Sequence, residues 1–84
     1  MSNAEFEYFV TSAIAAIVFA ASKSDNVVTL YNVGYHEDLD EVVYEVRNAA
    51  GEYLADNEDN KNQFNMVMLN AAMSKLEGVT TIAA

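Results

Sequence analysis

The chain lacks several residues that stabilise small proteins or mark common functional sites. It has no cysteine, proline or tryptophan, and it has only one histidine and three glycines among 84 residues. Without cysteine it can form neither disulfides nor thiolate metal sites. So few glycines leave no glycine-rich phosphate-binding loop and no dinucleotide fingerprint. A domain this short buries only about 60–65 % of its unfolded surface, so we expect it to gain stability by association.

Basic residues are also scarce. The sequence has 4 Lys and Arg against 13 Asp and Glu, which gives a formal net charge of −9, although 52 % of the residues are hydrophobic. This charge opposes direct binding of nucleic acid or of an anionic membrane. It favours binding to a basic surface of another protein. The absence of cysteine fits a reducing compartment, so we expect a cytoplasmic protein.

An uncharged segment near the N-terminus, residues 8–22, is long enough to suggest a targeting signal. However, Glu5 and Glu7 precede it where a signal peptide carries basic residues. A membrane span needs about 20 apolar residues, whereas this segment includes Thr11 and Ser12. We therefore expect a buried helix here rather than a signal or a span.

Cap spacing and hydrophobic periodicity predict three helices. Ser2, Asp38 and Asn60 each precede a Glu or Gln by three residues, which is the spacing of a capping box. Apolar residues then recur at steps of three and four, as on one face of a helix. The predicted helices cover residues 4–21, 39–55 and 61–77.

Two segments read as strands. Residues 27–35 are rich in β-branched and aromatic side chains, and a shorter segment of the same kind covers residues 79–83. The sequence therefore predicts an α+β fold in a single domain over residues 1–84. The expected order is helix–strand–helix–helix–strand, with a small sheet packed on three helices.

The first and third predicted helices are apolar over most of their circumference. A helix that is apolar all round must be buried all round, and one short chain can cover only part of two such helices. We therefore expect a homodimer, formed through the first helix, the third helix or the strands. The alternative is that the two helices cover each other with the sheet beneath them. The predicted dimer interface consists of Phe9, Ile14, Ile17, Phe19, Met66, Met68 and Met73.

Acidic residues follow the second predicted helix at steps that place them on one face. Arg47 is the only basic residue of that helix, and its helical neighbours Val43 and Gly51 cannot pair with it. We interpret the acidic stripe as a surface that binds Lys and Arg of a partner; the alternative is an ordinary solvated face. The predicted partner-binding residues are Asp38, Glu41, Glu45, Glu52, Asp56 and Asp59.

Mimicry of DNA is possible but is not required by this spacing. Along the predicted helix the carboxylates would be about half as dense as the phosphates of one DNA strand. A basic patch on a partner would bind them without matching that density.

His36 is the main candidate for chemistry. It precedes Glu37 and Asp38, and a histidine beside carboxylates could bind a metal or act as a base. We favour the simpler interpretation that it ends a loop before a helix whose first turn attracts acidic residues. The segment after Asp56 lacks the glycine and the glutamate that a calcium loop requires. We therefore expect no enzyme, no metal and no cofactor.

A short, strongly acidic, cysteine-free α+β chain without a catalytic motif resembles the small phage-encoded inhibitors of host defence. That class includes inhibitors of restriction, BREX and CRISPR systems. The resemblance is one of size and composition over the whole chain, and it assigns no residue roles. It implies a dimer that occupies a nucleic-acid-handling enzyme in the host cytoplasm.

Two functions remain from the sequence. The first is a non-enzymatic inhibitor that binds a basic surface of a partner through acidic side chains. The second is a structural or assembly module that binds through apolar, methionine-rich helices, because methionine adapts to varied surfaces.

Overall fold

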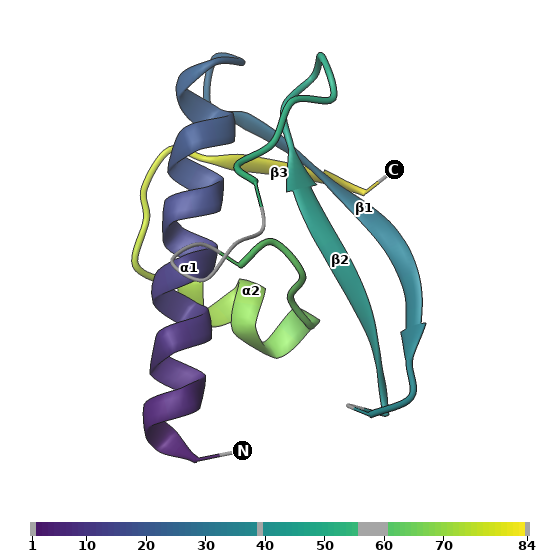
Figure 1. The fold of residues 1–84 in the computed structure, drawn as a ribbon. Helices are drawn as coiled ribbons and strands as arrows, with labels where there is room; N and C mark the ends of the chain where they lie inside the picture. Colours follow the sequence, from purple (N-terminus) through teal and green to yellow (C-terminus); the bar gives the residue numbers. More distant parts are fainter. Residues whose placement is uncertain (1, 39, 56–60, 84) are drawn as a thin grey trace.

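A computed structural model describes residues 2–38, 40–55 and 61–83 of the chain. The fold is α+β, with a three-stranded sheet in the order β2-β1-β3. β1 and β2 are antiparallel, whereas β1 and β3 are parallel. The elements in chain order are α1 (Asn3–Ser22), β1 (Val27–His36), β2 (Glu41–Arg47), α2 (Met66–Met73) and β3 (Thr80–Ala83) (Figure 1).

The long N-terminal helix α1 agrees with its prediction. Ser2 is the N-cap, and its hydroxyl oxygen accepts the backbone N–H of Glu5 at 3.1 Å. One side of the helix, which includes Val10 and Ile17, is buried in the core. The opposite stripe is exposed and carries Thr11 and Val18. Within one subunit α1 is therefore buried on one side only, whereas its composition predicted burial on all sides.

The prediction of a helix over residues 39–55 was wrong. Residues 41–47 form the strand β2, which pairs along β1 from Thr29 opposite Arg47 to His36 opposite Glu41. The helical spacing of the apolar residues coincided with a run rich in β-branched and aromatic side chains, which favours a strand. Gly51, expected inside that helix, lies in a turn with a φ of +83°.

The third predicted helix is much shorter than expected. α2 covers Met66–Met73 instead of residues 61–77, so the described chain has two helices and not three. Its N-cap is Asn65, whose side-chain oxygen accepts the backbone N–H of Met68 at 2.8 Å. The expected cap, Asn60, lies outside the described residues.

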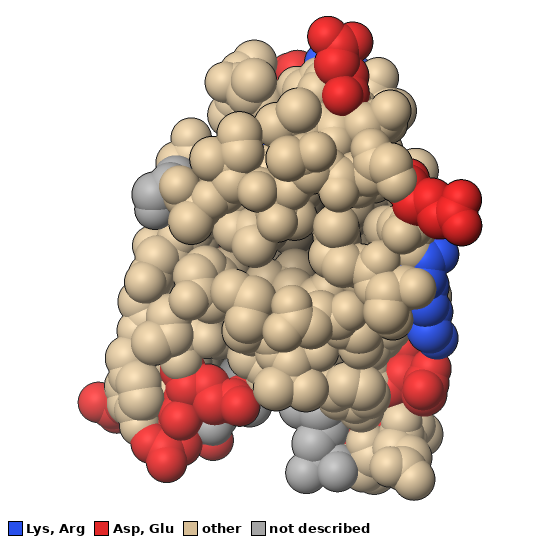
Figure 2. Space-filling model, turned by 180° about the vertical axis from the view of Figure 1, so that it is seen from behind, with Lys and Arg blue, Asp and Glu red and all other residues tan. Residues whose placement is uncertain are grey.

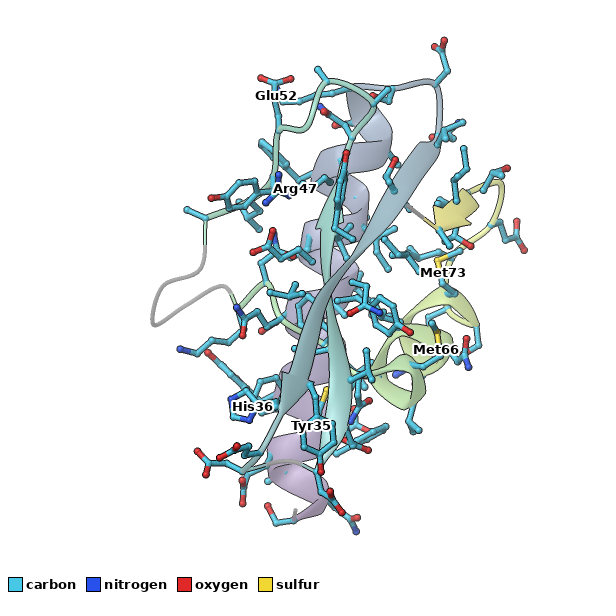
Figure 3. The ribbon with its side chains drawn as sticks, turned by 90° about the vertical axis from the view of Figure 1, so that its right-hand side faces the viewer. Tyr35, His36, Arg47, Glu52, Met66 and Met73 are labelled. Carbon is cyan, nitrogen blue, oxygen red and sulfur yellow. The ribbon has the colours of Figure 1, made fainter. Side chains whose placement is uncertain are left out.

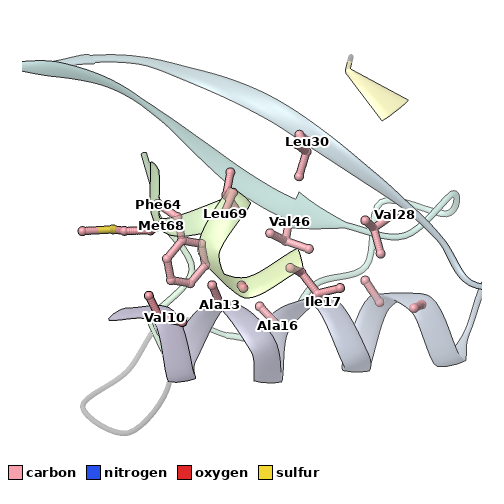
Figure 4. Packing of buried hydrophobic residues seen from close by; sticks show 13 residues of the cluster. Val10, Ala13, Ala16, Ile17, Val28, Leu30, Val46, Phe64, Met68 and Leu69 are labelled. Carbon is pink, nitrogen blue, oxygen red and sulfur yellow. The ribbon is translucent and has the colours of Figure 1, made fainter. Parts of the chain in front are cut away.

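The core lies between α1, α2 and one face of the sheet (Figure 4). The two helices pack on each other with the sheet beneath, as the alternative to the dimer proposed. Ile17 and Met68, predicted at a dimer interface, are 0 % and 1 % exposed and belong to this core. The subunit exposes 5027 Å², close to the roughly 4900 Å² expected for a monomeric protein of this mass. One subunit therefore closes its own core.

The outer edge of β2 is covered by the segment that precedes α2. Phe64 exchanges two backbone hydrogen bonds with Tyr44, at 2.8 and 2.9 Å. The buried side chain of Asn62 accepts the N–H of Val46 at 3.0 Å and donates to the carbonyl oxygens of Val46 and Leu54. Asn62 thus takes the place of a neighbouring strand for one residue of β2.

A β-bulge interrupts the pairing of β1 with β2. The register shifts between Asn32 and Gly34, so Val33 is the additional residue. Gly34 has a φ of +115°, which a side chain would strain, and its N–H is held by the side chain of Asn32 at 2.9 Å. Beyond the bulge the hairpin continues with Tyr35 directly opposite Val42.

The substitution Asn62→Ala should destabilise the protein by roughly 2–3 kcal/mol, because it leaves the buried N–H and C=O groups of β2 without partners. Urea denaturation followed by circular dichroism measures the change. Gln63→Ala, at the exposed neighbouring position, is the matched control and should change stability by less than about 0.5 kcal/mol. Equal losses in the two variants would contradict the role assigned to Asn62.

Candidate functional site

The predicted acidic stripe is not one helix face, because its four described residues lie on a strand and two turns. Glu41 and Glu45 belong to β2, Asp38 lies in the turn before it, and Glu52 lies in the turn after it. Asp56 and Asp59 lie outside the described residues. The four described residues therefore do not form the single helix face that was predicted.

The expectation that Arg47 leaves the acidic residues unneutralised was wrong. Its Nε donates to Glu45 Oε1 at 2.9 Å, and a terminal nitrogen donates to the same oxygen. The guanidinium of Arg47, which Figure 3 labels, also lies over the rings of Tyr31 and Tyr53, 4.8 and 4.9 Å from their centroids. Hydrogen bonding to Glu45 raises the pKa of Arg47 above its ordinary value. Glu45 is thus neutralised within the subunit.

Two further predicted residues are engaged in local structure. Glu41 Oε2 accepts from the side-chain amide of Asn65, the N-cap of α2, at 2.6 Å. Glu52 Oε1 accepts from the side-chain amide of Asn48 at 3.0 Å. Asn48 is itself buried, and its oxygen accepts two backbone N–H groups of the same turn. These two carboxylates therefore stabilise a helix cap and a turn through hydrogen bonds. They are less free to bind the basic side chains of a partner.

Replacing Arg47 by Met should lower the melting temperature by a few degrees, because it removes both ring contacts and leaves Glu45 unpaired. Arg47→Lys should also lower it, since a point charge cannot reproduce the planar contacts of the guanidinium. Lys75→Met is the control: its pair with Glu7 spans 4.0 Å between exposed side chains and should contribute almost nothing. Similar melting curves for Arg47→Met and Lys75→Met would contradict this role.

Among the described residues, three exposed carboxylates lie close together where β1 turns into β2. Glu37, Asp38 and Asp40 are all exposed in this turn. Figure 2 shows the largest group of acidic side chains at this end of the molecule, at its lower left. Within the described residues these three side chains form no ion pair. We call Glu37, Asp38 and Asp40 the acidic tip.

An apolar pair lies directly beside the acidic tip. Tyr35 and Val42 face each other across the hairpin and are 59 % and 40 % exposed. An exposed aromatic residue next to carboxylates can contact both the stem and the charge of a Lys or Arg side chain. The end of the hairpin therefore combines apolar contact with negative charge.

His36 lies at the same end, as the last residue of β1. It pairs with Glu41, and its Nδ1 atom is buried without a hydrogen-bond partner. It therefore ends a strand, and it does not precede a helix as expected. No group of three potential metal ligands occurs among residues 2–38, 40–55 and 61–83.

The remaining predicted interface residues differ in exposure. Phe9, Ile14, Phe19 and Met73 are half-buried, whereas Met66 is 40 % exposed on α2. Val67, next to it, is 60 % exposed. Met66 is therefore the one exposed residue of the predicted interface, and Val67 beside it was not predicted.

By length and composition α1 could cross a membrane. The core helix of a globular protein passes the same test, and seven residues of α1 are buried against the rest of this chain.

Comparison of the chain with protein-family models, with curated proteins and with solved structures finds no match. The chemistry of the described residues is therefore the basis for a functional interpretation.

Sequence reasoning included Asp38 but missed the rest of the hairpin-end surface. The run from Glu37 to Glu41 was visible, yet it was assigned to the first turn of a helix. A hairpin interpretation, with Tyr35 and Val42 on paired strands, would have brought the same residues together at a turn.

Proposed function

We propose that this protein is a non-enzymatic inhibitor that binds a basic surface of a nucleic-acid-handling host-defence protein. The observation that supports this proposal best is the acidic tip, with three exposed carboxylates at the end of a hairpin. The partner class follows from the resemblance of this small acidic chain to phage-encoded inhibitors.

Charge supports a protein partner with a basic surface. A chain of net charge −9 is attracted over a distance to clusters of Lys and Arg, which accelerates encounter. The acidic tip concentrates part of this charge on a protruding element that can enter a groove. In a nucleic-acid-handling enzyme, such a groove is shaped and charged to receive phosphates.

Apolar contact would add specificity to this attraction. Tyr35 and Val42 are exposed beside the acidic tip, and aromatic residues are enriched where interfaces concentrate their binding energy. A partner that contacts both the carboxylates and Tyr35 would be held more tightly than charge alone allows.

The proposal predicts that neutralising the acidic tip abolishes capture of the partner. The test variant combines Glu37→Gln, Asp38→Asn and Asp40→Asn. The control combines Glu7→Gln, Asp25→Asn and Glu77→Gln, which removes the same number of exposed carboxylates elsewhere. Asp25 and Asp40 both have positive φ, which Asn tolerates. Immobilised protein is incubated with bacterial lysate, and captured proteins are quantified at low and high salt.

The expected result is a protein captured by wild type and control but lost with the test variant. Capture should weaken steeply with salt, because salt screens the attraction between opposite charges. Short duplex DNA should compete with capture, because the DNA and the acidic tip would occupy the same basic surface. Equal loss in both variants would show that only overall charge matters and would overturn the site. Resistance to the DNA competitor would overturn the partner class.

A structural or assembly module is the second candidate, because α2 exposes Met66 and Val67. In that case Met66→Ser together with Val67→Ser should remove binding that persists at high salt, while the tip variant should have no effect. The salt dependence of capture separates the two functions.

A further inference from the structure

The two edges of the sheet differ in how they are protected. The outer edge of β2 is covered by Asn62 and Phe64. β3 lies at the other edge, and no strand lies beyond it in the described chain. All four residues of β3 are exposed.

Apart from its shortness, β3 carries none of the features that usually protect an edge strand. It contains no charged residue, no proline and no bulge, and unprotected edges tend to pair with another strand. Its residues are Thr80, Thr81, Ile82 and Ala83, three of them β-branched. Ile82 is 50 % exposed. Its shortness is the only restraint on pairing.

The hydrogen bonds to β1 fix which groups of β3 are free. The N–H of Thr80 donates to the carbonyl oxygen of Asn26 at 2.8 Å. Along a strand, successive residues direct their N–H and C=O groups to opposite edges. Thr80 and Ile82 therefore bond toward β1, while Thr81 and Ala83 direct theirs to the open edge.

These free groups are complementary to themselves. An antiparallel second copy with a two-fold axis at Ile82 would place Thr81 opposite Ala83 of that copy, and Ala83 opposite its Thr81. Both pairs would be hydrogen-bonded pairs, which gives four backbone bonds. The two Ile82 side chains would meet in the closer, non-hydrogen-bonded pair.

Charge also favours a second copy as the occupant. Each chain carries −9, so copies can associate only where the acidic residues are absent. Figure 2 shows such a face over β3 and α2, with an uncharged, hollowed middle and acidic side chains at its margins. An uncharged edge offers no carboxylate to a basic partner, whereas pairing with its own copy there brings no like charges into direct contact.

We propose that β3 pairs with β3 of a second copy, joining two sheets into one of six strands in a homodimer. This interface uses the strands, which the sequence left open beside the two helices, and it contains none of the predicted interface residues. It is independent of the proposed inhibitor function, because the acidic tip is not part of it. Four paired residues bury less than the about 1200–2000 Å² of stable interfaces, so the dimer should dissociate on dilution.

Sedimentation equilibrium up to millimolar protein should show a reversible monomer–dimer exchange. Ile82→Lys should raise the dissociation constant about tenfold or more, because two like charges would face each other at the axis. Val67→Lys adds the same charge to α2, which the pairing does not require, and should leave the constant near the wild-type value or lower it by reducing net charge. Circular dichroism of each variant serves as the control for correct folding.

Cross-linking tests the register separately. In the cysteine-free chain, Ile82→Cys would place two Cα atoms about 4.5 Å apart, within the range of a disulfide. Thr80→Cys, on the same face of the strand, would place them about 13 Å apart. Under mild oxidation the first variant should form a covalent dimer and the second should not.

Three results would overturn the inference. The first is a wild-type protein that stays monomeric at all concentrations. The second is a dimer that Val67→Lys disrupts and Ile82→Lys does not, which would assign the interface to α2. The third is equal cross-linking of the two cysteine variants, which would exclude the register.

Discussion

The closure of the outer edge of β2 is the constraint on which the rest of the fold depends. Phe64 bonds to Tyr44 through its backbone and places its side chain, 0 % exposed, in the core. The same segment supplies Asn62 to the strand and Asn65 to the N-terminus of α2. One short stretch therefore covers a sheet edge, fills the core and starts a helix. An apolar residue in place of Asn62 would leave β2 open, since shape alone cannot satisfy backbone groups.

Buried asparagines fulfil in this chain the role that further regular structure has in larger domains. Asn48 organises the turn after β2, Asn62 pairs with the strand, and Asn65 caps α2. Glu41 and Glu52 accept from two of these amides, so part of the negative charge is used internally. Among the described residues, Glu37, Asp38 and Asp40 of the hairpin turn are neighbouring exposed carboxylates without an ion pair.

Local patterns predicted α1, β1 and β3 because each has a signal that depends on few distant contacts. Ser2 caps α1, and β-branched residues mark both strands. β2 was mistaken for a helix because its apolar residues also satisfy helical spacing; what decides between the two is pairing with β1, a non-local contact. The same error moved Glu41 and Glu45 from a strand to a helix face. The start of α2 was missed because Asn65 was hidden inside a longer periodic segment.

The two proposed surfaces occupy different ends of β1, and this separation has a consequence for how the protein would act. β3 pairs with Val27 to Leu30, whereas the acidic tip follows His36. Six residues of strand between them span about 20 Å, so dimerisation would leave the tip accessible. Because β1 runs parallel to β3, an antiparallel β3 pair would direct the two β1 strands, and their acidic tips, in opposite directions. A dimer of this kind could hold two partner molecules apart, but it could not place both tips in one basic groove. Its advantage would lie in stability and in bridging partners, since avidity requires that both sites reach one target.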